Sequence, residues 1–133
     1  MCRNFADMNT DLKIVVVDDD PDILELLKYS FRKKGDSIFA FESPKEAFHF
    51  IAQNKPDLII SDWMMPDIDG IQLCRLMAVD PELRKIPFIF LTCKDDKADK
   101  DLAWSSGAAE FITKPVRIGD LMNKVRDLIF LKK

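Results

Sequence analysis

The sequence predicts an α/β fold in which a parallel sheet of five strands is covered by helices on both faces. Two observations lead to this prediction. Five short apolar segments recur along the chain, and segments with helical periodicity separate them. The short segments are apolar throughout rather than at alternate positions, which is typical of strands buried on both faces of a sheet. Because βαβ crossovers are right-handed, this alternation predicts a doubly wound sheet.

Each predicted strand is a short apolar run bounded by polar or turn-forming residues. Runs of this length fit strands better than helices. The five runs are KIVVV (13–17), SIFAF (37–41), DLIIS (57–61), PFIFLT (87–92) and EFIT (110–113).

The first two predicted helices carry clear start signals. Pro21 opens the first helix, which we expect to continue to Lys34 and to stop at Gly35. Ser43 caps the second helix, with Pro44 at its first position and Glu46 at its third. The residues expected on the apolar faces are Ile23, Leu26, Leu27 and Phe31 in the first helix and Ala47, Phe48 and Ile51 in the second.

The remaining three helices follow the third, fourth and fifth strands. We expect them from about Ile71 to Val79, from Asp95 to Ser106, and from Ile118 onward. The last of these has the clearest helical spacing of apolar residues, namely Ile118, Leu121, Met122, Val125, Leu128 and Ile129.

Length and composition favour a single cytoplasmic domain. The 133 residues suit one domain that buries its core without disulfides or structural metal. Residues 1–11 are polar and aperiodic, so we expect a flexible N-terminal tail and a domain at 12–133. Three cysteines without a CxxC pair favour a reducing compartment, and no apolar run is long enough to span a membrane. The net charge of -3 gives no electrostatic footprint for nucleic acid.

Residues capable of chemistry stand where the predicted strands end. In a parallel sheet the carboxyl ends of the strands share one edge, which is where ligands bind in doubly wound folds. The residues at these ends are Asp18, Asp19 and Asp20 after the first strand, Asp62 after the third, Thr92 after the fourth and Lys114 after the fifth. We therefore expect carboxylates, a hydroxyl and an ammonium group to converge there.

Such a cluster suits phosphoryl chemistry supported by a divalent cation. Neighbouring carboxylates repel each other, and Mg²⁺ removes this cost because it prefers oxygen ligands. A carboxylate can also attack a phosphoryl group, which makes Asp62 a candidate nucleophile with Lys114 as a second positive charge. Thr92 is a candidate hydrogen-bond donor to a phosphate oxygen.

Each of these features has an ordinary structural explanation when it is taken alone. An aspartate at a strand end is common in turns, and Asp20 fits a helix cap. We assign turn and capping roles to Asp67, Asp69 and Gly70, and packing to Trp104. The functional interpretation depends on the four features occurring together and in order.

The ordered segments resemble the receiver domain of bacterial two-component response regulators. They are IVVVDDDP, DLIISDWMMPDIDG, PFIFLT and GAAEFITKP, and the resemblance covers about residues 12–131. It implies the flavodoxin-like receiver fold with strand order 2-1-3-4-5.

The resemblance implies a phosphorylation site and a metal site. Asp62 would be the phosphoacceptor that becomes an aspartyl phosphate. Asp18 and Asp19 would hold Mg²⁺ together with Asp62, with Asp19 the more direct ligand and Mn²⁺ an expected substitute. The backbone carbonyl of Met64 would complete the protein's share of the metal ligands.

The resemblance also implies a switch. Thr92 would be the hydroxyl that moves toward the phosphate, Lys114 would pair with the phosphate or with Asp62, and Phe111 would be the aromatic switch residue. A cis peptide bond is expected at Lys114–Pro115. Two positions depart from the family pattern, because Cys93 replaces a residue that is usually smaller and Phe111 lacks a hydroxyl group.

The expected function is therefore signalling rather than turnover of a substrate. A histidine kinase or phosphotransfer protein would supply the phosphoryl group. The face formed by the fourth helix, fifth strand and fifth helix would then bind a target or a second copy of the chain. The domain would promote its own phosphorylation and dephosphorylation, without binding nucleic acid or membrane.

Three other functions stay open at this stage. A phosphatase in the haloacid-dehalogenase style would need a second aspartate two residues after the nucleophile, but the stretch here is DWMMP. A flavin carrier would need a glycine- and hydroxyl-rich loop after the first strand, where DDDPD stands instead. A receiver-like interaction scaffold that works without phosphorylation would bind its partner unchanged after Asp62→Ala.

Overall fold

The predicted sheet is present with the expected strand order. The computed structural model describes residues 11–63, 70–92 and 97–131. Its strands are β1 (Lys13–Val17), β2 (Ser37–Phe41), β3 (Leu58–Asp62), β4 (Phe88–Thr92) and β5 (Glu110–Thr113). They form one parallel sheet in the order β2-β1-β3-β4-β5, which confirms the doubly wound fold.

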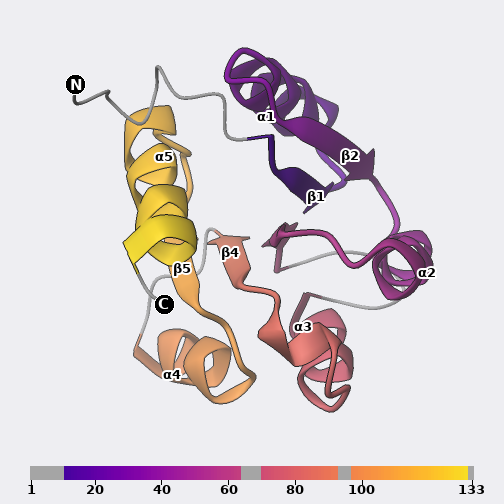
Figure 1. The fold of residues 1–133 in the computed structure, drawn as a ribbon. Helices are drawn as coiled ribbons and strands as arrows, with labels where there is room; N and C mark the ends of the chain where they lie inside the picture. Colours follow the sequence, from indigo (N-terminus) through magenta and orange to yellow (C-terminus); the bar gives the residue numbers. More distant parts are fainter. Residues whose placement is uncertain (1–10, 64–69, 93–96, 132–133) are drawn as a thin grey trace.

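Helices cover both faces of this sheet. They are α1 (Pro21–Arg32), α2 (Pro44–Asn54), α3 (Gly70–Ala78), α4 (Lys97–Ser105) and α5 (Ile118–Arg126), with a short 3₁₀ helix, η2 (Leu83–Lys85), and a π-helical turn, η3 (Asp127–Leu131). Figure 1 shows α1 and α5 on one side of the sheet and α2, α3 and α4 on the other. Among the described helices, none is both long and apolar enough to cross a bilayer.

The strands divide their apolar side chains between two separate cores. Alternate residues of a strand point to opposite faces. Val15, Ile59 and Phe90 therefore pack with α2, α3 and α4, whereas Val16, Ile60 and Leu91 pack with α1 and α5. Both faces are covered, which explains why the strands are apolar throughout.

The starts of α1 and α2 agree with the prediction from sequence, but the end of α1 does not. The side chain of Asp20 accepts a hydrogen bond from the Asp22 N–H, and that of Ser43 accepts one from the Glu46 N–H. The prediction that α1 extends to Lys34 is wrong, since the helix ends at Arg32 and Gly35 follows with a φ of 90°.

The assignment of Leu26 to the buried face of α1 is also wrong. Leu26 is 40% exposed, and the buried positions of α1 are Leu24, Leu27 and Phe31. Successive residues are about 100° apart around a helix, so a stripe centred between Leu24 and Leu27 turns Leu26 outward. Trp104, which was expected to pack, is 46% exposed on α4.

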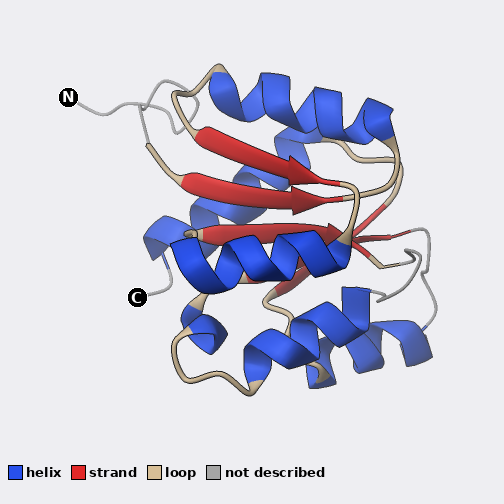
Figure 2. Cartoon of the chain, turned by 90° about the vertical axis from the view of Figure 1, so that its right-hand side faces the viewer, coloured by secondary structure: helices blue, strands red, loops and turns tan. Residues whose placement is uncertain are grey.

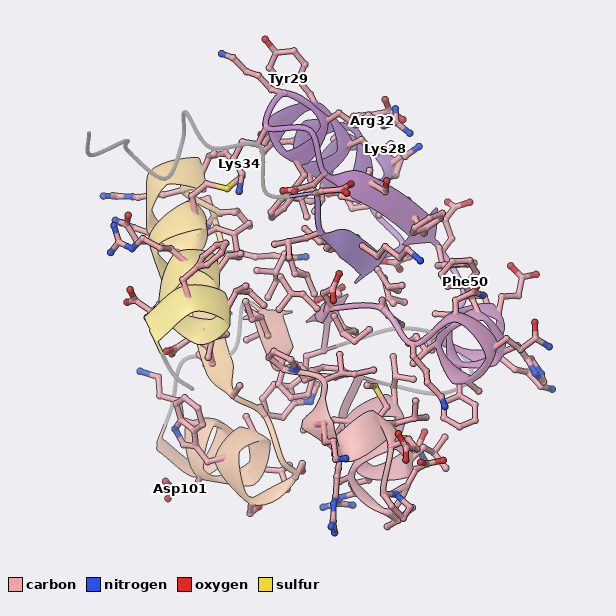
Figure 3. All side chains as sticks on the ribbon, viewed as in Figure 1. Lys28, Tyr29, Arg32, Lys34, Phe50 and Asp101 are labelled. Carbon is pink, nitrogen blue, oxygen red and sulfur yellow. The ribbon has the colours of Figure 1, made fainter. Side chains whose placement is uncertain are left out.

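A buried ion pair lies at the amino edge of the sheet. The Lys34 ammonium lies 3.4 Å from a carboxylate oxygen of Asp36, and both side chains are buried. The other oxygen of Asp36 accepts a hydrogen bond from the Leu12 N–H at 2.9 Å. In Figure 3, Lys34 lies between α1 and α5, whereas Tyr29 points outward from α1. Burial lowers the pKa of Lys34, against the opposing effect of the Asp36 charge.

We predict that Asp36→Asn lowers the free energy of unfolding by about 3 kcal/mol, because it removes the carboxylate that lies 3.4 Å from the buried Lys34 ammonium. Adding Lys34→Met should recover most of this loss, since the double variant buries no ion. Urea unfolding measures both changes. As a control, Glu25→Ala removes the exposed ion pair with Lys28 and should cost less than about 1 kcal/mol. Equal losses in the single and double variants would contradict the prediction.

Candidate functional site

Four predicted site residues lie close together at the carboxyl edge of the sheet, namely Asp18, Asp19, Asp62 and Lys114. Figure 2 shows the visible strand arrows pointing toward one edge of the molecule. Asp62 is the last residue of β3, and Asp18 and Lys114 each directly follow a strand. By the alternation of the strands, these three residues share the face covered by α1 and α5, since Val16, Ile60 and Ile112 stand two residues before them and pack there.

Asp18 is fully buried and held on both carboxylate oxygens. Oδ1 accepts a hydrogen bond from the Asp20 N–H at 2.9 Å, and Oδ2 lies 3.2 Å from the Lys114 ammonium. Burial raises the pKa of Asp18, although the Asp20 N–H and the Lys114 charge both act to lower it. The Asp18 side chain is therefore fixed in position, although burial still destabilises its ionised form.

Asp62 is buried beside Asp18, and its negative charge is destabilised in a similar way. Its Oδ1 accepts a hydrogen bond from the Trp63 N–H at 2.8 Å and lies 3.4 Å from the Lys114 ammonium. Burial and the charge of Asp18 raise the pKa of Asp62, and Lys114 and the Trp63 N–H offset them only in part. Among the described residues, both of these contacts fall on Oδ1, which makes Oδ2 the better candidate for attack on phosphorus.

Lys114 bridges the two buried carboxylates. Burial acts to lower the pKa of Lys114, but the charges of Asp18 and Asp62 outweigh it and raise that pKa. The backbone N–H of Lys114 donates to the Thr92 carbonyl at 2.7 Å, which ties β5 to β4 at this point. The Lys114–Pro115 peptide bond is cis, as expected.

The carboxylates fit a hard divalent cation. Asp18, Asp19 and Asp62 can each offer one oxygen such that all three atoms lie within 4.8 Å of one another. Asp19 is exposed, so its carboxylate is accessible for direct coordination. In the part of the chain that the structure describes, the site has three acidic groups and one lysine. Mg²⁺ prefers oxygen ligands such as these carboxylates.

Of the other expected site residues, some are described by the structure and some lie outside the described ranges. Thr92 is buried at the end of β4, next to Asp62 in the register because Asp62 pairs with Leu91. Phe111 is half-buried on β5, opposite Phe90. Met64, Asp67, Asp69 and Cys93 lie outside the described residues.

Two residues of the site were not identified from sequence. Gly70, expected only to turn or cap, begins α3 so close to the sheet that an added Cβ would collide with the Asp62 carbonyl and stand 2.9 Å from the Phe90 ring. Its N–H donates to the Trp63 carbonyl at 2.8 Å. Trp63 is buried against Phe90 and Phe111. Their only sequence signal was their position after Asp62.

A doubly wound sheet with an acidic, lysine-bridged site at its carboxyl edge is typical of a class of signalling domains. Residues 14–126 match the response regulator receiver domain family. The chain therefore belongs to this family, whose members interact with histidine kinases and phosphotransfer proteins and generally bind Mg²⁺ at an acidic pocket.

Relatives support the same assignment. The chain is 32% identical over 117 residues to the phosphate regulon transcriptional regulatory protein PhoB of Rhizobium meliloti (strain 1021), covering 88% of this chain and 52% of that protein. The chain thus spans about half the length of this relative.

Solved receiver domains have the same fold. The receiver domain of a signal transduction histidine kinase from Syntrophus aciditrophicus is 38% identical with a TM-score of 0.84, covering 92% of each chain. The Francisella response regulator 1452 receiver domain is 33% identical with a TM-score of 0.84, covering 92% of this chain and 99% of that one.

The raised pKa of Asp62 predicts a pH-dependent gain in stability from Asp62→Asn in the absence of metal. A carboxyl whose pKa is raised by folding lowers stability once the pH exceeds its unfolded-state pKa, because the unfolded chain then ionises before the folded protein does, and the loss is complete above the raised folded-state pKa. The variant should therefore match the parent below the ordinary carboxyl pKa, gain stability relative to the parent as pH rises from the ordinary pKa to the raised pKa of Asp62, and keep a constant advantage above it. Thermal unfolding across this range measures the difference, and a constant difference at all pH values would contradict it.

Magnesium provides the matched comparison for this variant. At a concentration 100-fold above its dissociation constant, a bound ion stabilises the folded state by about 2.7 kcal/mol. We expect this gain in the parent and a smaller one in Asp62→Asn, which offers one fewer carboxylate.

We predict that Gly70→Ala moves the end of β3 and costs about 1–3 kcal/mol of stability, because the new methyl group meets backbone atoms that cannot rotate away. Magnesium affinity should fall with it, since the Asp62 backbone is displaced. Gly119→Ala is the control, because nothing lies within 4 Å of the added Cβ. Urea unfolding and magnesium titration test both variants, and an equal response of the two would exclude the proposed close approach.

Proposed function

We propose that this receiver domain accepts a phosphoryl group on Asp62 from a histidine kinase or a histidine phosphotransfer protein, in a reaction that requires Mg²⁺. The observation that carries the proposal is the lysine-bridged acidic cluster. Lys114 lies 3.2 Å from Asp18 and 3.4 Å from Asp62, and Asp19 adds an exposed carboxylate.

Different residues of the site have different roles in the phosphoryl transfer. In the step, Oδ2 of Asp62 attacks phosphorus as the bond to the donor nitrogen breaks, and the electron pair of that bond stays on the donor imidazole. The Trp63 N–H and Lys114 hold Oδ1 and thereby orient the carboxylate. Bound through Asp18, Asp19, Asp62 and the Met64 carbonyl, Mg²⁺ (or Mn²⁺) would neutralise charge on the phosphoryl oxygens.

Phosphorylation of Asp62 would add negative charge close to Lys114 and Thr92. Lys114 can pair with a phosphoryl oxygen, and the Thr92 hydroxyl can donate a hydrogen bond to one after a short movement. Movement of Thr92 would vacate space that Phe111 can enter. The α4-β5-α5 face would then change its shape and bind a target or a second copy of the chain.

Phosphorylation can be tested with acetyl phosphate and Mg²⁺ followed by intact-protein mass spectrometry. The parent should gain one phosphoryl group, and Asp62→Asn should gain none, because an amide lacks the nucleophilic oxygen. Omission of magnesium should suppress the reaction in the parent.

Asp101→Asn is the control for a general loss of acidic charge. Asp101 is exposed on α4 (Figure 3) and is not part of the acidic cluster, so this variant should be phosphorylated like the parent. Phosphorylation of Asp62→Asn at the parental rate would refute the assignment. A partner that binds Asp62→Ala as tightly as it binds the phosphorylated parent would instead support a scaffold that works without phosphorylation.

A further inference from the structure

The acidic cluster and the aromatic switch position lie on opposite faces of the sheet. Asp62 belongs to the face covered by α1 and α5, whereas Trp63, Phe90 and Phe111 pack with the core beneath α2, α3 and α4. A signal that starts at Asp62 must therefore cross the sheet to reach Phe111. The Asp62–Trp63 peptide is a direct covalent crossing point.

Trp63 is held on both sides of this crossing. Its N–H donates to Oδ1 of Asp62 at 2.8 Å, and its carbonyl accepts from the Gly70 N–H at 2.8 Å. The absence of a side chain at Gly70 lets α3 begin against this peptide, because a Cβ there would lie 3.0 Å from the Trp63 Cα. A displacement of the Asp62 carboxylate therefore acts on a peptide that is tightly constrained.

The indole of Trp63 reaches across the neighbouring strand to Phe111. Its ring centroid lies 5.3 Å from that of Phe90 on β4 and 6.2 Å from that of Phe111 on β5. The contact with Phe111 is edge-on, with an interplanar angle of 83°, which is a favourable geometry for two aromatic rings. Trp63 is 4% exposed, so the indole has little freedom to move independently.

Phe111 in turn contacts the helix expected to change. The Lys100 ammonium of α4 lies 6.0 Å from the centre of the Phe111 ring. Phe111 is only half-buried, so it has room to reorient. A continuous series of contacts thus leads from Asp62 through Trp63 and Phe111 to α4.

We propose that Trp63 is a positioning residue that transmits the state of Asp62 to Phe111, in addition to the route through Thr92. This inference rests on the proposed phosphorylation of Asp62. A change in the carboxylate shifts the Trp63 peptide, the indole moves with it, and Phe111 loses its edge-on contact. The Trp63 side chain takes no part in the transfer chemistry, in which only the backbone N–H of Trp63 orients the Asp62 carboxylate.

The test places para-fluorophenylalanine at position 111 and follows its fluorine NMR signal on addition of Mg²⁺ and beryllofluoride. In the parent we expect the signal to shift with occupancy. Trp63→Leu keeps an apolar side chain and the backbone N–H that holds Asp62, but its side chain cannot reach β5. At saturating beryllofluoride, the shift at 111 should be largely lost in this variant. Trp63→Phe should restore part of it. Phe50→Leu, a substitution in the aromatic contacts with β2, is the control and should leave the shift unchanged.

The outcomes separate this inference from the proposed function. If the parent does not bind beryllofluoride, the phosphorylation proposal fails, and the inference fails with it. If the parent binds and Trp63→Leu shows the full parental shift, only the role of Trp63 is refuted.

A second measurement covers the case in which Trp63→Leu does not fold. In Trp104→Phe, Trp63 is the sole remaining tryptophan, so incorporated fluorotryptophan reports on it alone. Its signal should move with the same beryllofluoride midpoint as the signal at 111, and Phe111→Leu should alter its response. A Trp63 signal that does not respond would overturn the inference.

Discussion

The imbalance of charge at the carboxyl edge of the sheet is the constraint on which the site depends. Among the described residues, Asp18, Asp19 and Asp62 face a single lysine, and two of the acids are buried. Backbone N–H groups of residues 20 and 63 hold one oxygen of each buried acid, so the side chains do not turn away from each other to relieve repulsion. Groups fixed in this way are oriented before a ligand arrives, which is how preorganised sites stabilise developing charge.

The opposite edge of the sheet shows what a balanced arrangement looks like. There Lys34 faces Asp36, one positive charge against one negative, and Asp36 also binds the Leu12 N–H. This pair joins the end of α1 to the start of β1, and the pair itself carries no net charge. Both edges bury ions. Among the described residues, the Lys34–Asp36 pair is neutral, whereas the acids of the carboxyl-edge cluster outnumber its lysine. This difference in net charge, rather than burial itself, distinguishes the acidic cluster from the Lys34–Asp36 pair.

The sequence was informative where a pattern repeats and uninformative where contact is decided in three dimensions. Continuous apolar strands and capped helices predicted the sheet and its layers, and strand ends predicted that Asp18, Asp62 and Lys114 would meet. Leu26 was misplaced because a wide apolar stripe does not show which side faces the sheet. The pairing of Lys34 with Asp36 and the tight approach of Gly70 depend on how α1 and α3 dock, which no local pattern encodes.

The alternation of strand residues organises the site into two sets that share a backbone. The positions of Asp18, Asp62 and Lys114 continue the face of Ile14, Ile60 and Ile112, where α1 and α5 pack. The positions of Trp63, Thr92 and Phe111 continue the other face, that of Ile59, Phe88 and Phe90. Charge is therefore gathered on one side, whereas the residues able to convert a small movement into a change of packing lie on the other. Because close-packed interiors transmit strain, a shift of the β3 backbone is felt on both faces at once. This division lets the same strand end bind a charged group and report it to α4 without exposing the aromatic residues to the polar site.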